Sequence, residues 1–291
     1  MAILFHNEGF DPAPWLELLG LGLPGMEIRV FPNIGNRDEI EYAVIWNLPH
    51  GELQHFKNLK AILLLSAGAD FLKDDPTLPR NIPIVRLIDT TVQRDMALHC
   101  LYFVLRFHRL YHQNSLNQRQ CYWERLEYAP ASSCHIGILG LGEMGEPIAQ
   151  ELIRAGYPVH SWVRTPRESN GVKLFVGDQQ LADFFAHSNI LINVLPNTPQ
   201  TRCFINLERL QQMPPGSHLI NVGRGITVDE DALHELLDSG HIKAAALDVF
   251  QQEPLPAEHW MWQHPGVVVT PHAAGNTYAH SGAPEIIANI Q

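Results

Sequence analysis

Three residues in the second half of the chain could act together on a carbonyl compound. Arg224 lies between two glycines, Glu253 follows the apolar run 244–250, and His272 ends the apolar run 267–272. An arginine flanked by glycines can hold a carboxylate or polarise a carbonyl through charge-assisted hydrogen bonds. A histidine held by a carboxylate can act as a general acid near neutral pH. The group could therefore protonate a carbonyl oxygen as hydride reaches the carbon, while Arg224 stabilises the developing oxyanion.

Each of these residues also has a plainer interpretation. A lone arginine in a glycine-flanked turn can equally be an ordinary surface residue, and most of the 16 histidines should pack or face solvent. Their positions favour the chemical interpretation. Loops that follow the strands of a parallel sheet meet at one edge, and α/β proteins bind their ligands there.

A second chemical signal is the glycine-rich segment 140–145, which reads GLGEMG. Gly140 permits a tight turn, Gly142 lets the backbone approach a pyrophosphate, and Gly145 lets the next helix pack closely on the sheet. The helix N-terminus adds free N–H groups and partial positive charge. Because an apolar run precedes the segment and a helical pattern follows it, dinucleotide binding is favoured over an ordinary turn. The predicted cofactor contacts in this turn are Gly140, Gly142, Glu143 and Met144.

The next apolar run, 158–163, is followed by no acidic residue before Glu168. NAD-specific folds usually place Asp or Glu here to bind the ribose 2′-hydroxyl. Arg164, Thr165 and Arg167 occupy the segment instead, and arginine holds a 2′-phosphate through charge-assisted hydrogen bonds. NADP(H) is therefore favoured, with NADH as a weaker alternative. Interpreting the arginines as solvated loop charges would leave the missing acid unexplained.

These segments need a scaffold that brings strand ends together, and the apolar runs predict one. Predicted strands lie at 2–5, 43–46, 61–66 and 83–87, and then at 135–140, 158–163, 190–196, 218–223, 244–250 and 267–272. Predicted helices lie at 146–156 and 229–240, and 94–120 predicts one long helix that is buried between two layers and joins the domains.

We therefore expect an α/β protein with two doubly wound parallel-sheet domains. Residues 1–95 and 275–291 would form a smaller, flavodoxin-like substrate domain. Residues 96–274 would form a Rossmann-type NADP-binding domain.

The composition excludes several classes of protein. A net charge of -11 opposes binding to nucleic acid or to an anionic membrane surface. The four cysteines are far apart, which indicates reduced thiols rather than a disulfide scaffold. We find no signal peptide, no membrane-spanning apolar run and no metal-binding motif, so a cytoplasmic protein without a metal is expected.

The order of the motifs resembles that of the D-isomer-specific 2-hydroxyacid dehydrogenases. The segments that carry the resemblance are SAGAD (66–70), GLGEMG (140–145), LPNTPQTR (195–202), NVGRG (221–225), LDVFQQEPLP (247–256) and WQHPGVVVTPHAA (262–274). Within the family, AVIWNLP, SWVRTPR and WQHP are most similar to the bacterial glyoxylate/hydroxypyruvate reductase A group.

The resemblance implies an enzyme that reduces a small 2-oxo acid, glyoxylate or hydroxypyruvate, to glycolate or D-glycerate with NADPH, as a homodimer. It implies that Arg224 holds the substrate, that His272 is the acid/base and that Glu253 orients His272. Asp248 would bind the nicotinamide carboxamide. The other implied contacts are Trp46 and backbone N–H groups near Ala67, Gly68 and Ala69 for the substrate, and Leu195, Pro196, Thr198, Val222, Gly223 and His272 for the cofactor.

Two features depart from the family pattern. Residues 94–97 read RDMA where the family often has Met-Ala-Glu, and the chain stops at ANIQ (288–291) where family members usually continue for some tens of residues. A less stable first domain is therefore expected.

Two alternatives remain open. One is a D-lactate or D-3-phosphoglycerate type of 2-hydroxyacid dehydrogenase, but a phosphorylated substrate would need basic residues near the site. Only Lys57 and Lys60, expected on a helix surface, cluster between residues 43 and 80. The other is a cofactor-sensing corepressor on the same fold.

Overall fold

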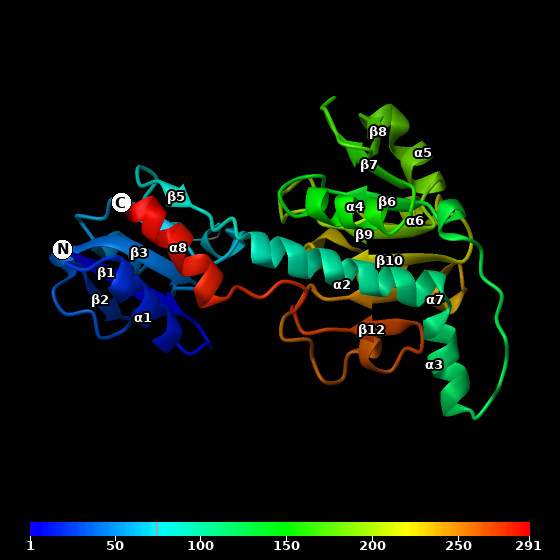
Figure 1. The fold of residues 1–291 in the computed structure, drawn as a ribbon, viewed down its shortest axis with the longest axis horizontal. Helices are drawn as coiled ribbons and strands as arrows, with labels where there is room; N and C mark the ends of the chain where they lie inside the picture. The colour runs from blue at the N-terminus through cyan, green and yellow to red at the C-terminus, as the bar shows by residue number, and fades with distance from the viewer. Residues whose placement is uncertain (74) are drawn as a thin grey trace. The chain divides into compact units, whose positions relative to one another are not determined.

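The computed structural model describes residues 1–73 and 75–291, which divide into two compact units (Figure 1). Unit 1 comprises Met1–Val92 and Asn276–Gln291, and unit 2 comprises Gln93–Gly275. The first division falls inside a helix, three residues before the predicted boundary at 95/96, and the second falls at 275/276.

Unit 1 contains a five-stranded parallel sheet in the order β2-β1-β3-β4-β5. Its strands are β1 (Ala2–Asn7), β2 (Glu27–Val30), β3 (Ile40–Trp46), β4 (Ala61–Leu64) and β5 (Ile84–Val85), and its helices are α1 (Ala13–Gly22) and α8 (Ala279–Ile290). Ile3 and Phe5 of β1 pack with Trp15 and Ile286 on one face, whereas Leu4 packs into a separate cluster on the other. The alternation buries both faces, as a doubly wound sheet requires.

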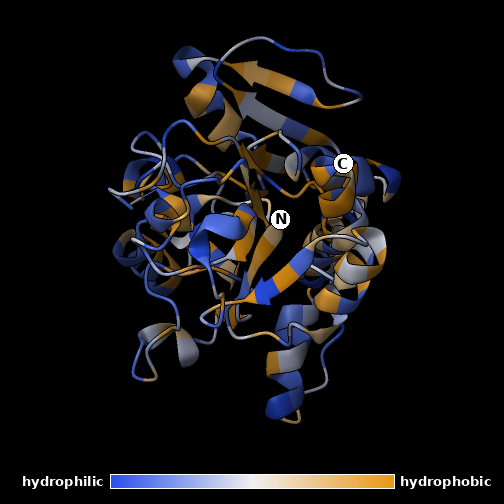
Figure 2. Ribbon diagram, turned by 90° about the vertical axis from the view of Figure 1, so that its left-hand side faces the viewer, coloured by the Kyte–Doolittle hydropathy of each residue, from blue (hydrophilic) through white to orange (hydrophobic). Residues whose placement is uncertain are grey.

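Unit 2 contains a seven-stranded parallel sheet in the order β12-β11-β10-β9-β6-β7-β8. Its strands are β6 (Ile136–Leu139), β7 (Val159–Val163), β8 (Lys173–Val176), β9 (Ile190–Asn193), β10 (Ser217–Asn221), β11 (Ile242–Leu247) and β12 (Val267–Val269). Its helices are α2 (Thr90–His108), which begins in unit 1, α3 (Tyr111–Arg119), α4 (Gly145–Arg154), α5 (Leu181–Ala186), α6 (Leu207–Gln211) and α7 (Glu230–Asp238). In Figure 2 the strands near the N label, which belong to unit 1, are mostly hydrophobic, whereas the helices carry both colours.

The predicted pair of parallel α/β sheets is therefore confirmed. In unit 1 the strand order reverses between β1 and β3, and in unit 2 it reverses between β6 and β9. Such switch points leave a crevice outside the carboxyl ends of the two strands, and open α/β sheets bind their ligands there. The switch point of unit 2 lies at the end of β6, where the glycine-rich segment 140–145 begins.

The single helix predicted over 94–120 is wrong. The chain forms α2 and α3, separated at Leu110, whose φ of 57° places it in the left-handed region. The α3 segment is mostly polar, so it has no apolar stripe to continue the packing of α2. Nor is α2 buried all round, because Leu98 and Tyr102 are 45% and 56% exposed. Met96 and Ala97, from the RDMA segment, face inward.

Smaller differences concern edges and turns. The edge strands β2 and β8 were not predicted, and β5 is only two residues long. Lys57 and Lys60 lie in the turn before β4 rather than on a helix, and Lys60 pairs with Glu41 at 2.5 Å. None of the helices in the described part of the chain is both long and apolar enough to cross a membrane.

Candidate active site

The glycine-rich turn joins β6 to α4 and needs glycine at two positions. Gly140 has a φ of 99°, and a Cβ there would lie 2.9 Å from the carbonyl oxygen of Val194. A Cβ on Gly145 would overlap the carbonyl oxygen of Gly140, so that only glycine lets α4 begin here. A Cβ on Gly142 would meet no atom within 4 Å, so its backbone is open to a ligand. The turn thus presents main chain and a helix N-terminus to an anion.

The arginine-containing segment follows β7, the strand next to β6. Arg164, Thr165 and Arg167 are exposed, and a terminal nitrogen of Arg167 donates to the carbonyl oxygen of Leu141 in the glycine-rich turn. The structure therefore brings Arg167, one of the residues predicted to bind the 2′-phosphate, against the predicted pyrophosphate turn.

The loops after β9 and β10 carry the remaining predicted cofactor contacts. Leu195, Pro196 and Thr198 follow β9, and Val222 and Gly223 follow β10. A Cβ on Gly223 would lie 2.8 Å from the carbonyl oxygen of Leu195, so these two loops touch through their main chains.

A buried network of polar side chains lies under these loops, and the sequence prediction did not include it. Asn193, Asn221 and Thr227 are 0%, 1% and 0% exposed. The Asn193 amide donates to Asn221 Oδ1 (2.8 Å) and to Thr227 Oγ1 (2.7 Å). Leu195 N donates to Asn193 Oδ1 (3.2 Å), and Gly223 N donates to Asn221 Oδ1 (3.1 Å). The network therefore fixes the main chain of both loops.

Arg224 begins the 3₁₀ turn Gly225–Thr227, and this turn is pressed against the segment that contains Glu253. A Cβ on Gly225 would overlap the main chain of Phe250, so glycine is required there. Arg224 Nη1 donates to the carbonyl oxygen of Gly223 (2.7 Å).

His272 and Glu253 form a direct pair. His272 Nδ1 lies 2.8 Å from Glu253 Oε2, and Phe250 N donates to Glu253 Oε1 (3.0 Å). Burial alone would raise the pKa of Glu253, but the hydrogen bonds from His272 and Phe250 and the charge of Arg224 outweigh it and lower that pKa. The carboxylate therefore stays ionised and occupies Nδ1, which leaves Nε2 of His272 for proton exchange.

Asp248 holds the loop that carries His272. It is 2% exposed and accepts hydrogen bonds from Thr270 Oγ1 (2.6 Å), Ala273 N (2.8 Å) and Ala274 N (3.0 Å). The main-chain N–H of His272 also donates to the main-chain carbonyl oxygen of Asp248 (2.8 Å). Three donors already use most of this carboxylate's accepting capacity, so its visible contacts are with the loop, and nicotinamide binding by Asp248 stays a prediction.

In unit 1 the predicted substrate residues also lie at strand ends. Trp46 ends β3 beside the switch point, with its ring 5.6 Å from the ring of Phe10. The loop after β4 carries Ala67, Gly68 and Ala69, and Ser66 Oγ donates to the Gly68 carbonyl oxygen (2.7 Å). Within the described residues, the N–H groups of these three residues find no acceptor. Successive free N–H groups of this kind can bind an anion.

Arg86 is a basic residue beside this loop that the sequence prediction did not include. It directly follows β5, the neighbour of β4, and Nη1 of Arg86 donates to the Ala67 carbonyl oxygen (3.5 Å). Leu87 N donates to the Ser66 carbonyl oxygen (3.2 Å). The position of Arg86 at the end of a strand, on the same sheet edge, is the signal that could have revealed this residue.

The described residues contain no group of three or more His, Cys, Asp or Glu side chains that could hold a metal ion.

Comparison with known sequences gives a consistent picture. The sequence model for "D-isomer specific 2-hydroxyacid dehydrogenase, NAD binding domain" matches residues 101–274. A glyoxylate/hydroxypyruvate reductase A from Serratia proteamaculans is 37% identical over 295 residues, covering 100% of this chain and 94% of the relative.

Solved structures agree with the sequence relatives. A D-isomer specific 2-hydroxyacid dehydrogenase from Xanthobacter autotrophicus Py2, in complex with NADPH and MES, has a TM-score of 0.95 at 39% identity, covering 99% of this chain and 93% of that one. An NADPH-dependent glyoxylate/hydroxypyruvate reductase from Sinorhizobium meliloti, in complex with NADP and sulfate, has a TM-score of 0.90 at 29% identity, covering 100% and 93%.

Proposed function

Because the chain belongs to the D-isomer-specific 2-hydroxyacid dehydrogenase family, we propose that it reduces glyoxylate or hydroxypyruvate to the D-2-hydroxy acid with NADPH. The observation that carries this proposal is the His272–Glu253 pair, 2.8 Å apart, in the same unit as Arg224 and the glycine-rich turn. The relatives and the structures bound to NADPH or NADP support both the substrate class and the cofactor.

The residues of this chain divide the chemistry among them. When bound, NADPH supplies the hydride that reaches the carbonyl carbon. His272 delivers a proton from Nε2 to the carbonyl oxygen, and Glu253 holds the ring through Nδ1 and stabilises the imidazolium before that transfer. Arg224 binds the substrate carboxylate and stabilises the negative charge that develops on the oxygen. In unit 1, the N–H groups of residues 67–69 bind the carboxylate, and Trp46 sets the size of the substrate.

The cofactor would be held by groups in unit 2. The glycine-rich turn, with Glu143 and Met144, binds the pyrophosphate, and Arg164, Thr165 and Arg167 bind the 2′-phosphate. The loops of Leu195, Pro196, Thr198, Val222 and Gly223 line the path to the nicotinamide. The nicotinamide carboxamide is assigned to Asp248, and His272 is a further cofactor contact.

The test measures the oxidation of NADPH and, in parallel, of NADH. The substrates offered are glyoxylate, hydroxypyruvate, pyruvate and 3-phosphohydroxypyruvate. We expect NADPH-dependent turnover of glyoxylate or hydroxypyruvate. Arg224→Ala should lower kcat/KM by about 100-fold or more, and His272→Gln by about 100- to 10,000-fold. Arg154→Ala is the matched control, because this exposed arginine pairs with Glu151 on α4 and is assigned to neither the substrate nor the cofactor. Tight NADPH binding without turnover of any of the four acids would contradict the proposal and favour a cofactor sensor.

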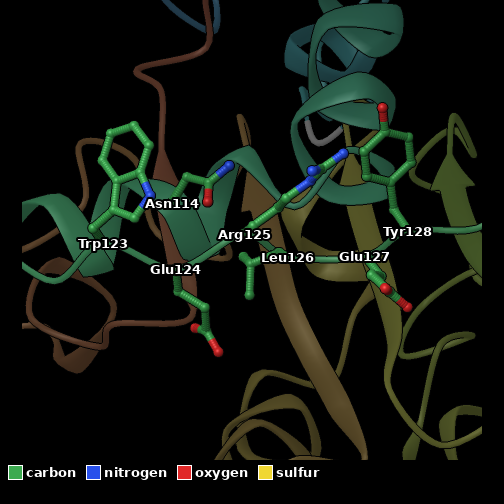
Figure 3. A pocket seen from close by; sticks show the side chains of 7 residues that line it. All are labelled: Asn114, Trp123, Glu124, Arg125, Leu126, Glu127 and Tyr128. Atoms are coloured by element: carbon green, nitrogen blue, oxygen red, sulfur yellow. The ribbon is translucent and has the colours of Figure 1, made fainter.

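We also infer that the protein is a homodimer, from the segment 121–130 that follows α3. Tyr122, Trp123 and Tyr128 are 57%, 97% and 47% exposed. Figure 3 shows Trp123 and Arg125 on one side of the extended segment, with Glu124 and Leu126 on the other. An exposed tryptophan on an ordered segment is typical of an interaction site.

The segment is held at both ends, which supports its role as a preformed contact. Tyr122 N donates to the Asn117 carbonyl oxygen (2.9 Å) at the start. At the end, His108 Nε2 lies 2.7 Å from the Ala129 carbonyl oxygen, and the Arg109 guanidinium lies 4.3 Å from the ring centroid of Tyr128. A main chain that is held at both ends loses little entropy on binding, which favours this segment as the contact for a second copy of the chain.

Light scattering coupled to size-exclusion chromatography tests the dimer. The wild type should elute as a dimer, and Tyr122→Ser with Trp123→Ser should elute as a 32.8 kDa monomer. Trp262→Ser, at a tryptophan outside this segment that is 50% exposed, should leave the dimer intact. A monomeric wild type would contradict the inference.

All four cysteines are free thiols, which supports a reducing compartment such as the cytoplasm.

A further inference from the structure

The network of Asn193, Asn221 and Thr227 ends on the main chain of Arg224. Thr227 Oγ1 donates to the Arg224 carbonyl oxygen (2.5 Å), and the Thr227 N–H donates to the same oxygen (3.2 Å). Asn221 Nδ2 lies 3.4 Å from it as well. Three donors thus converge on one carbonyl group, that of the residue to which we assign substrate binding.

The direction of each hydrogen bond in the network is determined. An amide nitrogen can only donate, so Asn193 Nδ2 fills an acceptor site on Thr227 Oγ1. The single hydroxyl hydrogen of Thr227 is then free to be donated, and the Arg224 carbonyl oxygen receives it. Because these side chains are 0–1% exposed, water cannot replace a lost partner without rearrangement.

We propose that Thr227, supported by Asn193, is a positioning residue for the reaction, because it fixes the peptide from which the Arg224 side chain extends. This inference rests on the proposed role of Arg224. The hydroxyl bonds to the Arg224 loop rather than to a strand of the sheet, and the same Asn193 that supports it also holds Leu195 N. One buried cluster therefore fixes the position of the Arg224 loop relative to the Leu195 loop, which is assigned to the cofactor.

The test compares Thr227→Val with Thr227→Ser. Valine has nearly the size of threonine but lacks the hydroxyl, whereas serine keeps the hydroxyl and loses only a methyl group. We expect Thr227→Val to lower kcat/KM for glyoxylate by about 10- to 100-fold, which corresponds to about 1.4–2.7 kcal/mol. Thr227→Ser should stay within about threefold of the wild type. The dissociation constant of NADPH should change by less than about threefold in both variants, because Asn193 and Asn221 still hold the cofactor loops.

A double-mutant cycle with Arg224→Ala separates positioning from general stabilisation. In the Arg224→Ala background, Thr227→Val should cause almost no further loss of kcat/KM, because the group that it positions is gone. Ser161→Ala is the matched control, since Ser161 Oγ is also buried and donates to a main-chain carbonyl, that of Ile138 (2.7 Å). This control should lower the melting temperature without changing kcat/KM.

The possible outcomes are distinct. A wild type without turnover would overturn the proposed function itself. An active wild type with a normal Thr227→Val variant would overturn only the positioning role, as would a loss of equal size in the presence and absence of Arg224. If Thr227→Val does not fold, Thr227→Ala removes the same hydroxyl without placing a methyl group against Asn193, and the same comparisons apply.

Discussion

Arg164 and Arg167 should decide between the two nicotinamide cofactors by charge. Both side chains are exposed after β7, and Arg167 reaches the glycine-rich turn through the Leu141 carbonyl oxygen. A charge-assisted hydrogen bond contributes about 1.5–3 kcal/mol, so Arg164→Gln with Arg167→Gln should raise the KM for NADPH by about 10- to 100-fold or more. The KM for NADH, which has no 2′-phosphate, should change little. An equal rise in the KM values for NADPH and NADH in initial-rate assays would show that the arginines act on the fold instead.

Arg86 should strengthen substrate binding through a peptide group. In a planar trans peptide the carbonyl and the next N–H point in opposite directions. Arg86 donates to the Ala67 carbonyl oxygen, so it holds the Gly68 N–H toward the other side and polarises it. We expect Arg86→Gln to raise the KM for glyoxylate by about 3- to 10-fold with kcat nearly unchanged, since carboxylate binding is equal in ground and transition states. Arg80→Gln, also exposed in unit 1, is the control; a fall in kcat alone would contradict this account.

At the scale of elements, two glycines of one turn should respond in opposite ways. A Cβ on Gly142 meets nothing within 4 Å, whereas a Cβ on Gly145 overlaps the Gly140 carbonyl oxygen at the start of α4. Gly142→Ala should keep the melting temperature and raise the KM for NADPH, because its methyl group faces the pyrophosphate site. Gly145→Ala should lower the melting temperature by about 2–10 °C, from an overpacking cost of about 1–3 kcal/mol. Thermal melts of both variants without cofactor would test this, and equal melting temperatures for Gly142→Ala and Gly145→Ala would contradict the packing argument.

The sequence predicted the central strands because they are buried on both faces and read as continuous apolar runs, as in β6 and β9. It missed the edge strands β2 and β8, where polar residues such as Arg29 and Lys173 interrupt the pattern. The break at Leu110 could not be predicted, because leucine has no preference for the left-handed region and only tertiary packing selects it.

The candidate site divides in the same way. Residues directly after predicted strands, such as Arg224 and His272, could be placed because parallel strands end at a common edge. Thr227 could not, because its importance depends on which carbonyl oxygen its side chain reaches. That information lies in the three-dimensional path of the loops and not in residue type.

At the scale of the whole molecule, buried histidines should make stability depend on pH. His160 is 3% exposed, its Nε2 lies 2.9 Å from Ser188 Oγ, and burial lowers its pKa from 6.5 to about 4. Below pH 6.5 the unfolded chain gains a proton that the folded protein does not bind, so stability is lost as the pH falls toward 4. From pH 7 to pH 5 this group alone should lower the free energy of unfolding by about 2 kcal/mol.

Urea unfolding of the wild type, His160→Gln and His280→Gln at pH 7 and pH 5 would measure the effect. His280 is exposed on α8 and serves as the control. The glutamine at position 160 should make stability less sensitive to pH, although it costs stability at pH 7. An unchanged difference between the two pH values would show that His160 titrates normally in the folded protein.

The position of α8 in the chain sets the order in which the protein can assemble during synthesis. Ala283 and Ile286 of α8 complete the apolar cluster that contains Trp15 and Leu19 of α1, yet all of Gln93–Gly275 is translated between them. At about 5–20 residues per second, the ribosome needs roughly 10–40 s to cover that interval. Unit 2 is continuous in the sequence, so all of it is synthesised before α8. Until α8 is synthesised, the apolar face of α1 stays exposed to chaperones and proteases.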